Sequence, residues 1–457
     1  MKSGWRQKAI MRASSIFRST ALRLLACCVA ALAWTLLTPA HAAPAAKSAA
    51  KPAAQTAAKP AAAPVTLELA HNLGPQLEQR LQEVVERFSK ESGVTVTLRP
   101  FEKDGKPATL NLMRRAEAGD VLSQPKRFMP LYQMMDKAGA RLNSGDIAAD
   151  LKAGVVDARG RLVALPLVYS TPVLFYNKNA FRKAGLDPEQ PPATWFEMQG
   201  MLDKLQSAGY ACPYTSSWPV WVHIDNVSAL SGLPAANDKG QLTFNGLPQV
   251  KHIAMMATWT KAGYFRLFGR RDEASDKFND GECAMITTDS REASDFREAR
   301  GVELGVAPLP HHDDIYGGRR ATLADGASLW IGAGRSVAEY KAAAKLITFL
   351  LAPDMQVEMV RRYGSLPFTG AARAAARSAL LRDDDRMLDT AFTSLKGQGA
   401  QTALRVANIG ALSSLTNEEL EAVWADKKPA KAALDNAVAR GNKLLAAQPL
   451  LKRAQPF

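Results

Sequence analysis

The hydrophobic pattern is clearest between residues 65 and 98, where two apolar runs flank a stretch with helical spacing. Val65–Ala70 reads VTLELA and predicts a short strand, and Val94–Leu98 alternates as a half-buried strand does. A helix is predicted from Gly74 to Ser92. Its apolar residues fall on one helix face, at Leu77, Leu81, Val84, Val85 and Phe88. A strand, a helix and a strand at this spacing predict a βαβ unit, with parallel strands and helices on the sheet.

The rest of the chain continues in the same α/β style. Further strands are predicted at 161–168, 173–177 and 283–288, and further helices at Trp195–Ala208 and Val337–Leu351. The C-terminal third is predicted to be nearly all helical, with Thr416 as a candidate helix cap. An α/β body of this size usually divides into two lobes, and ligands bind between them or at the carboxyl ends of strands.

The N-terminal segment has the pattern of an export signal. Residues 1–23 carry six Lys and Arg and no acid, and an apolar run follows at Leu24–Leu37. This run is too short to span a bilayer comfortably. Ala40–Ala42 then places small residues where a signal peptidase cleaves. We predict a cleaved signal at residues 1–42. The alternatives are an uncleaved membrane anchor and, more weakly, a lipoprotein modified at Cys27.

The segment after the signal is rich in Ala, Pro and Lys. Residues 43–65 have no apolar periodicity and predict a flexible linker, which leaves residues 66–457 as the folded body. The net charge of +14 falls to +8 without residues 1–42, because six basic residues and no acids lie there. Lys47, Lys51 and Lys59 lie in the linker, so the folded body carries only +5. Spread over nearly 400 residues, this imbalance does not resemble a nucleic-acid footprint, which needs clustered cations.

Candidate chemistry in the body is sparse. Cys212 and Cys283 are its only cysteines. An exported protein permits a disulfide between them, but the pairing needs Cα atoms within about 7 Å, which the sequence leaves open. His311–Asp314 (HHDD) is interpreted as an exposed turn rather than a metal site. No phosphate-binding loop, G-x-S-x-G elbow or H-E-x-x-H motif occurs. We therefore expect no metal, no cofactor and no enzyme activity.

Several stretches resemble one known family. They are Ser170–Trp195, Gln249–Met256, Gly269–Met285, Asp325–Trp330 and Glu418–Leu445. They are similar to the family 1 extracellular solute-binding proteins, in particular to the branch that binds sn-glycerol-3-phosphate for Ugp-type ABC importers. The similarity extends from about residue 65 to residue 445 and is loose between residues 101 and 162.

The resemblance implies a fold, a location and partners. The fold is α/β with two lobes of the type II-like periplasmic binding proteins, joined by hinge strands, one of them near Ser170–Tyr176. Lobe 1 is expected at about 66–172 and 305–370, and lobe 2 at about 173–304 and 371–457. The implied location is the periplasm. The implied partners are a small-molecule ligand and the permease and ATPase of an importer, with the chain itself a monomer.

The resemblance also implies ligand-binding residues. Four positions agree with the family pattern, and they are Ser170, Trp218, Gly326 and Arg405. Arg405 can direct two N–H groups at a phosphate. Trp218 offers an apolar wall to a glycerol chain, Ser170 a hydroxyl, and Gly326 a close backbone approach to a ligand.

Other positions depart from the pattern. Asp289 stands where the family has Ser, Ser365 where it has Tyr, and Asp325 where it tends to have Gly. An unpaired Asp289 about 4 Å from a phosphate oxygen would repel it by roughly 4 kcal/mol at an effective dielectric constant of 20. Unless Asp289 points away or pairs with an Arg, a phosphodiester such as glycerophosphocholine fits better than glycerol-3-phosphate, with its cation held by an acid and Trp218.

We therefore expect a ligand of the glycerol-3-phosphate or glycerophosphodiester type. A neutral polyol or sugar is the alternative within the same fold, and a glycerophosphodiester hydrolase is the rival class.

Overall fold

The computed structural model describes residues 65–447, except residues 103, 116, 119–124, 153, 158, 238, 315–318, 381–385 and 397–408. The predicted signal peptide, the predicted linker up to residue 64, and Arg405 lie outside the described residues. No helix among the described residues is long and apolar enough to cross a bilayer.

The first sheet contains the predicted βαβ unit. Its strands are β1 (Thr66–His71), β2 (Thr95–Pro100), β3 (Leu110–Arg114), β4 (Phe128–Met129), β5 (Leu165–Ser170) and β10 (Asp325–Gly332). Their order is β2-β1-β3-β10-β4, with β5 paired to β10. Strand β1 is parallel to β2 and β3, while β10 runs antiparallel to β3, β4 and β5. The prediction of parallel strands around the first helix is thus confirmed.

Helices cover the first sheet and its edges. They are α1 (Pro75–Ser92), η1 (Pro125–Arg127), α3 (Leu131–Ala138), η2 (Ser144–Asp146), η3 (Ala149–Leu151), α10 (Val337–Leu351), α11 (Pro353–Tyr363) and α12 (Gly370–Leu380). Helix α1 ends as predicted at Ser92 and is capped by Gly93, whose positive φ of 69° favours glycine. Ser336 begins α10 with a capping box to Glu339. The apolar faces of these helices and the strands form one buried core.

The second sheet has the order β7-β8-β6-β9. Its strands are β6 (Pro172–Asn177), β7 (Cys212–Ser216), β8 (Cys283–Asp289) and β9 (Leu304–Pro308). Strand β6 is antiparallel to β8 and β9, and β7 is parallel to β8. In that pairing Cys212 lies opposite Cys283 with 4.5 Å between Cα atoms, and the two form a disulfide. The structure answers the question of their pairing, which the sequence left open.

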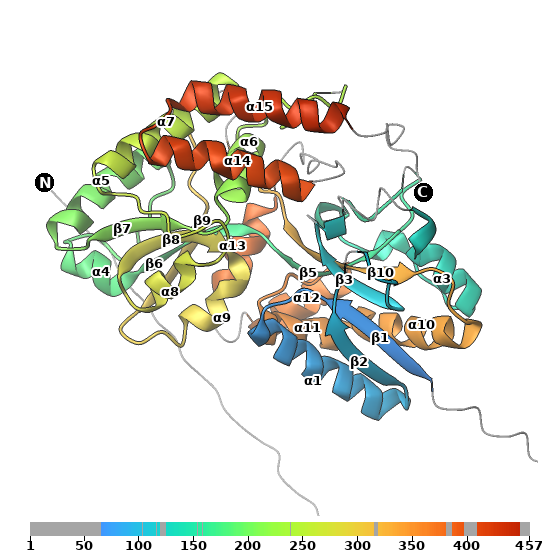
Figure 1. The fold of residues 1–457 in the computed structure, drawn as a ribbon. Helices are drawn as coiled ribbons and strands as arrows, with labels where there is room; N and C mark the ends of the chain where they lie inside the picture. The colour runs from blue at the N-terminus through green and yellow to red at the C-terminus, as the bar shows by residue number, and fades with distance from the viewer. Residues whose placement is uncertain are drawn as a thin grey trace, which may run out of the picture. The chain divides into compact units, whose positions relative to one another are not determined.

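The helices of the second half are more numerous. They are α4 (Lys178–Lys183), α5 (Trp195–Ser207), η4 (Trp221–Asn226), α6 (Val227–Leu230), α7 (Leu247–Lys261), α8 (Ala274–Asn279), η5 (Ser290–Glu292), α9 (Ala293–Phe296), α13 (Arg386–Ser394), α14 (Ile409–Trp424) and α15 (Ala430–Ala446). Helices α7, α14 and α15 pack together as a layer at the top of Figure 1. Thr416 was predicted to cap a helix, and this prediction is wrong. It lies inside α14, where its hydroxyl donates to the carbonyl of Leu412.

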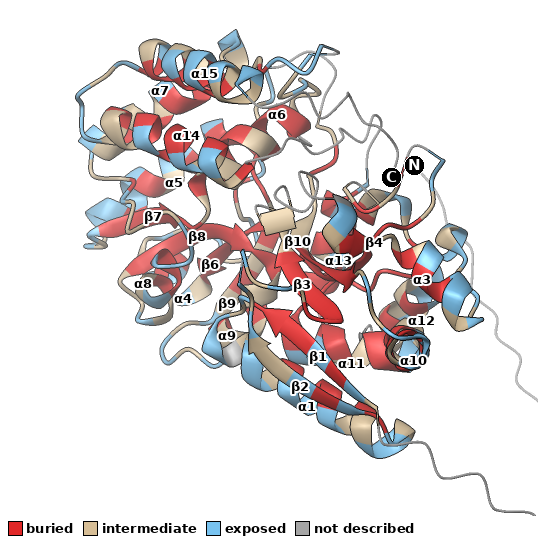
Figure 2. Ribbon diagram, turned by 45° about the vertical axis from the view of Figure 1, so that its right-hand side comes forward, coloured by how far each residue is buried: buried red, intermediate tan, exposed pale blue. Residues whose placement is uncertain are grey.

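The two sheets lie in opposite halves of the folded body (Figure 1). Their strands are mostly buried, and the covering helices expose their outer sides (Figure 2). A single residue, Thr171, separates β5 of the first sheet from β6 of the second. The Thr171 hydroxyl lies 2.5 Å from that of Thr322, and its carbonyl accepts the N–H of Ser290. This crossing lies where the sequence predicted a hinge.

The predicted lobe boundaries remain a prediction, but the strand order refines one of them. Strand β9 belongs to the second sheet and ends at Pro308, so the return toward the first sheet lies beyond the expected position near residue 305. Helix α12 packs on α11 beside the first sheet, and α13 contacts β9 in the second. Helix α12 therefore lies beside the first sheet, and α13 beside the second.

Candidate functional site

A cavity of about 430 Å³ opens where strands of the two sheets end. The first sheet contributes the last residues of β3 and β5 and the first residues of β10. The second half contributes the end of β8, the loops after β7 and before α8, and one side of α14. The carboxyl ends of strands are the predicted place for a ligand in an α/β fold, and the volume suits a small molecule.

Four predicted site residues line this cavity together, and they are Ser170, Trp218, Asp289 and Gly326. Ser170 and Asp289 are the last residues of β5 and β8. Ser365 is not among the lining residues. It is buried at 1% exposure after α11, and its hydroxyl has no hydrogen-bond partner among the described residues. Its role in binding stays a prediction, as does that of Arg405.

Asp289 is paired rather than free. Its carboxylate caps the short η5 turn by accepting the backbone N–H of Arg291 at 2.9 Å. It also accepts the Nε–H of Arg291, at 3.0 and 2.8 Å to the two oxygens. Burial by itself raises the pKa of Asp289, but the charge and hydrogen bonds of Arg291 hold that pKa below its ordinary value. Asp289 is thus paired with an Arg, the case in which a phosphate monoester was not expected to be disfavoured.

Gly326 serves strand pairing more directly than ligand approach. A Cβ at this position would lie 1.9 Å from the carbonyl oxygen of Val168 in the adjacent β5. The pairing between β10 and β5 has an irregular register close by, between Ala327 and Ser328. Glycine is therefore required by the neighbouring backbone, although the residue also lines the cavity.

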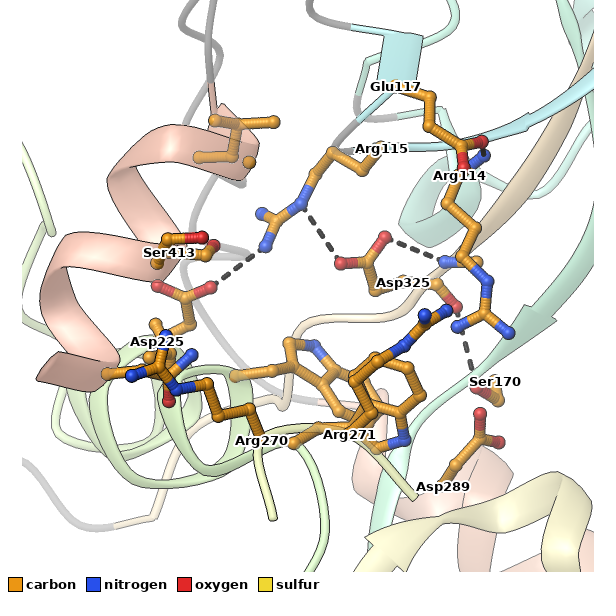
Figure 3. Close-up of a pocket in the computed structure, with 18 of the residues that line it drawn as sticks. Arg114, Arg115, Glu117, Ser170, Asp225, Arg270, Arg271, Asp289, Asp325 and Ser413 are labelled. Atoms are coloured by element: carbon orange, nitrogen blue, oxygen red, sulfur yellow. Dashed lines mark hydrogen bonds and ion pairs between the residues drawn. The ribbon is translucent and has the colours of Figure 1, made fainter. Parts of the chain in front are cut away.

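One side of the cavity holds a cluster of two acids and one base (Figure 3). Arg115 donates from Nη2 to Asp225 at 2.9 Å and lies within 3.0 Å of Asp325 through Nε. Burial lowers the pKa of Arg115, but the two carboxylates outweigh this effect and raise it. Burial also raises the pKa of Asp225, and the nearby charge of Asp325 adds to this effect. Two carboxylates around one guanidinium leave this cluster with a net charge of −1.

Another part of the lining is cationic. The guanidinium of Arg114 lies over the Trp218 ring, 5.0 Å from its centroid, and that of Arg271 lies 5.6 Å from it. Neither guanidinium forms an ion pair with a described carboxylate. Trp218 has a positive φ of 54°, rare for a residue other than glycine, and its N–H donates to the carbonyl of Arg271 at 2.9 Å. Such strain persists where the surroundings hold it, frequently at functional sites.

Sequence reasoning missed Arg114 and Arg271. Arg114 lies in the region of loose family similarity, and Arg271 lies in a matching stretch but was not singled out. The available signal was a pair of adjacent arginines in each segment, Arg114–Arg115 at a strand end and Arg270–Arg271 before a helix. That Trp218 holds a choline cation stays a prediction, and in this structure two guanidinium groups lie over its ring.

Helix α14 closes another side of the cavity with small polar groups. Ser413, Ser414 and Asn417 line it, together with the start of the helix at Ile409 and Gly410. The helix was predicted, but its position at the cavity was not. These hydroxyl and amide groups can donate to and accept from a polyol.

Three histidines form a chain away from the cavity. His223 Nδ1 lies 3.0 Å from His252 Nε2, and His252 Nδ1 lies 3.1 Å from His312 Nε2. Burial lowers the pKa of His223 to about 3 and, with help from Lys251, that of His312 to about 4. The HHDD sequence predicted a fully exposed turn, but His312 is partly buried and contacts His252. No group of three potential metal ligands was found in the described part of the chain.

Comparison with known proteins gives a consistent picture. The family described as bacterial extracellular solute-binding protein matches residues 83–385. The sn-glycerol-3-phosphate-binding periplasmic protein UgpB of Pectobacterium atrosepticum is 34% identical over 401 residues, covering 82% of this chain and 90% of that protein. UgpB of Escherichia coli K12 is 33% identical over 406 residues, covering 83% and 92%.

Solved structures show the same fold at lower identity. UgpB from Mycobacterium tuberculosis in complex with glycerophosphocholine has a TM-score of 0.70 at 20% identity, covering 84% of this chain and 99% of that one. Maltose-bound MalE3 from T. maritima has a TM-score of 0.66 at 21% identity, covering 83% and 100%. The shared architecture is the two-lobed solute-binding fold.

Proposed function

This chain belongs to the family of bacterial extracellular solute-binding proteins, and from that membership we propose that it is the periplasmic binding component of an ABC importer for glycerol-3-phosphate or glycerophosphodiesters. The ligand binds in the cavity between the two sheets, and closure of the lobes captures it. The closed form then delivers the ligand to a permease that an ATPase drives.

The observation that carries the proposal is the composition of the cavity. Guanidinium groups from both halves of the fold converge on it, and two of them, Arg114 and Arg271, have no carboxylate partner among the described residues. A phosphate group is the kind of ligand that such groups bind well. The names of the relatives, which bind sn-glycerol-3-phosphate, support the same class.

The glycerol end of such a ligand also finds partners. Asp225 and Asp325 carry carboxylates that accept hydroxyl donors, and Ser413 and Ser414 of α14 add hydroxyl groups. Trp221 lines the cavity as an apolar surface for the carbon chain. The cavity therefore combines an anion-binding part with a hydroxyl-binding part.

The Thr171 crossing supports closure of the lobes. Only one residue separates β5 from β6, and Ser170 and Asp289, on either side of this crossing, both line the cavity. A ligand that contacts these ends and the loops of both halves stabilises the closed arrangement. Hinge closure of this kind is a common response to ligand in two-lobed binding proteins.

We propose that the chain binds its ligand without chemical conversion, as binding proteins do. A glycerophosphodiesterase would release glycerol-3-phosphate from glycerophosphocholine, so a coupled assay for that product over several hours provides a direct check. Measurable turnover by the pure protein, abolished by substitutions in the cavity, would favour the hydrolase.

A thermal-shift screen tests the proposed ligand class. The purified protein is heated with glycerol-3-phosphate, glycerophosphocholine, glycerol, maltose or no addition. A ligand at 100 times its Kd adds about 2.7 kcal/mol to the free energy of unfolding, so a cognate glycerol phosphate raises the Tm by several degrees in a concentration-dependent way. Stabilisation by maltose or glycerol alone would support the neutral polyol or sugar alternative, which the acid cluster around Arg115 also accommodates.

A further inference from the structure

We infer that Arg114 and Arg271 form an anion clamp around the Trp218 ring, and that their combined charge selects a phosphate monoester dianion over a phosphodiester monoanion. This inference rests on the proposed function, because it takes the ligand to carry a phosphate. It assigns the phosphate to two residues that the sequence motifs did not single out.

The other arginines that line the cavity form ion pairs with carboxylates, which distinguishes Arg114 and Arg271 from them. Arg115 is shared by Asp225 and Asp325, and Arg291 binds Asp289. Arg270 donates from Nη2 to Glu421 at 2.6 Å, and its Nε binds the same carboxylate. Within the described ranges, Arg114 and Arg271 are the cavity arginines without an ion pair. They place two unpaired positive charges beside Trp218, at a different part of the lining from the cluster of Arg115, Asp225 and Asp325 with its net charge of −1.

The surroundings of Arg114 favour an anion. Burial lowers the pKa of Arg114, and the nearby charges of Arg291 and Arg271 lower it further, which outweighs the opposite effect of Asp289 and Asp272. Cations that are only partly balanced by nearby carboxylates raise the free energy of the empty cavity. A bound phosphate reduces this repulsion, so the free energy of phosphate binding is more favourable than a single isolated arginine would provide.

The clamp joins the two halves of the fold. Arg114 is the last residue of β3 in the first sheet, while Arg271 lies in the loop before α8, which packs on β8 of the second sheet. Trp218 and Arg271 are held together by the hydrogen bond from the Trp218 N–H to the Arg271 carbonyl. In Figure 3 both guanidinium groups lie at the same cavity as Asp325 and Ser170. A phosphate bound by both arginines would therefore tie one lobe to the other.

The ligand's own ionisation provides a readout of charge selection. A phosphate monoester has a second pKa near 6, so it is a dianion at pH 8 and mostly a monoanion at pH 5.5. A phosphodiester stays a monoanion throughout. Glu292, whose pKa burial and Asp289 raise to about 8, titrates in the same range and lies close to Arg291. An ionised Glu292 repels a dianion more strongly than a monoanion, so the ratio of monoester to diester affinity is also measured in Glu292→Gln, which stays neutral throughout.

Isothermal titration calorimetry on the full chain tests the clamp, with glycerol-3-phosphate, glycerophosphocholine and inorganic phosphate as probes. Arg114→Gln and Arg271→Gln each lower the affinity for glycerol-3-phosphate by about 10- to 100-fold at pH 8, the usual effect of losing a hydrogen bond to a charged group. Arg266→Gln is the matched control. Arg266 lies in the same loop and near Glu282 but does not line the cavity, so its loss changes the affinity less than about twofold.

The pH series gives the second expected result. Glycerol-3-phosphate binds at least about 10-fold more tightly than glycerophosphocholine at pH 8, and this ratio falls roughly fourfold at pH 5.5 as the dianion is protonated. Circular dichroism at each pH confirms that the variants are folded.

The outcomes separate this inference from the proposed function. If the wild-type chain binds glycerol-3-phosphate and both variants bind it equally well, the clamp is wrong and the proposed function stands. If the chain binds inorganic phosphate in an Arg114-dependent way but neither glycerol phosphate, the clamp stands and the proposed ligand is wrong. A diester that binds more tightly than the monoester at pH 8, or a chain that binds none of the three probes, overturns the inference.

Discussion

Arg291 and Asp289 form an ion pair beside the cavity, with side chains 12% and 5% exposed. Breaking such a pair from one side leaves a covered charge without its partner, which costs about 3–5 kcal/mol. We therefore predict that Asp289→Asn lowers the free energy of unfolding by about 3 kcal/mol in urea denaturation without ligand. The same change leaves a third uncompensated guanidinium at the cavity, so we expect inorganic phosphate to stabilise the variant more than the wild type.

A second ion pair in the same region provides the control for this substitution. Asp295 binds Arg80 at 2.9 Å, but both side chains are about one third exposed or less, at 32% and 26%. Solvent screens this pair more strongly, so Asp295→Asn should cost less than about 1 kcal/mol and leave phosphate binding unchanged. Equal losses of unfolding free energy in the two variants would show that the Arg291–Asp289 pair contributes no more to stability than the more exposed Arg80–Asp295 pair.

Gly326→Ala tests the close contact between β10 and β5. The added Cβ meets the Val168 carbonyl at 1.9 Å and the Tyr169 Cα at 2.7 Å, and backbone atoms cannot move aside without disturbing the pairing. We predict a loss of more than about 2 kcal/mol in the free energy of unfolding. At Gly200 in α5 an added Cβ would meet no heavy atom within 4 Å, so Gly200→Ala should be neutral or stabilise by up to about 1 kcal/mol. The opposite ranking in thermal denaturation would contradict this close approach of the two strands.

The histidine chain predicts acid sensitivity. His223 and His252 are fully buried, and burial lowers the pKa of both below the ordinary value of 6.5. A folded-state pKa below the unfolded one means that the stabilising contribution is complete above pH 6.5 and is lost as the pH falls toward 4 and below. The free energy of unfolding should therefore decline between pH 6.5 and 4, by up to about 1.4 kcal/mol per pH unit for each histidine that titrates.

Substitution separates this chain from other acid-sensitive groups. His252→Asn removes the central ring and should flatten the decline between pH 6.5 and 4, even if it lowers stability at pH 7.5. His311→Asn, next to the chain in sequence, is the control and should keep the slope of the wild type. An unchanged slope in His252→Asn would assign the acid sensitivity to other groups.

Glu292 is expected to lower the free energy of unfolding as the pH rises, whereas the histidines lower it as the pH falls. Burial and the charge of Asp289 raise its pKa to about 8 from an ordinary value of 4.5. Because the folded-state pKa is the higher one, its contribution is complete below pH 4.5 and is lost as the pH rises through 8. We expect Glu292→Gln, which stays neutral, to be more stable than the wild type by up to about 5 kcal/mol at pH 9 and about equal to it at pH 4.5. The exposed Glu298→Gln should show no such difference, and equal stability of Glu292→Gln and the wild type at pH 9 would refute the shift.

Much of the fold follows from local pattern. The β1–α1–β2 unit and α10 were predicted close to their observed bounds, because alternation, helical spacing and caps are local signals. Thr416 was misassigned since Thr also occurs inside helices, where its hydroxyl donates to a carbonyl one turn earlier. The Cys212–Cys283 bond depends on the register of β7 and β8, which no local signal contains.

For the cavity, too, the sequence predicted some of the residues that lie there but not the interactions that depend on the fold. Ser170, Trp218, Asp289 and Gly326 were predicted because they lie beside recognisable motifs, and all four line the cavity. Their electrostatic roles were not predictable, since the charge that acts on a ligand depends on pairing in three dimensions. Arg291 neutralises Asp289 from two residues away, whereas Arg114 and Arg271 meet at Trp218 from segments more than a hundred residues apart. Ligand contact by the four residues remains a prediction.

The proposed ligand class is tested best by calorimetric titration of the purified chain with glycerol-3-phosphate at pH 8, in competition with glycerophosphocholine. We expect saturable binding of one glycerol-3-phosphate per chain, displaced by the diester and weakened by Arg114→Gln. No binding of either glycerol phosphate, together with saturable binding of a neutral sugar at the same cavity, would contradict the proposed function.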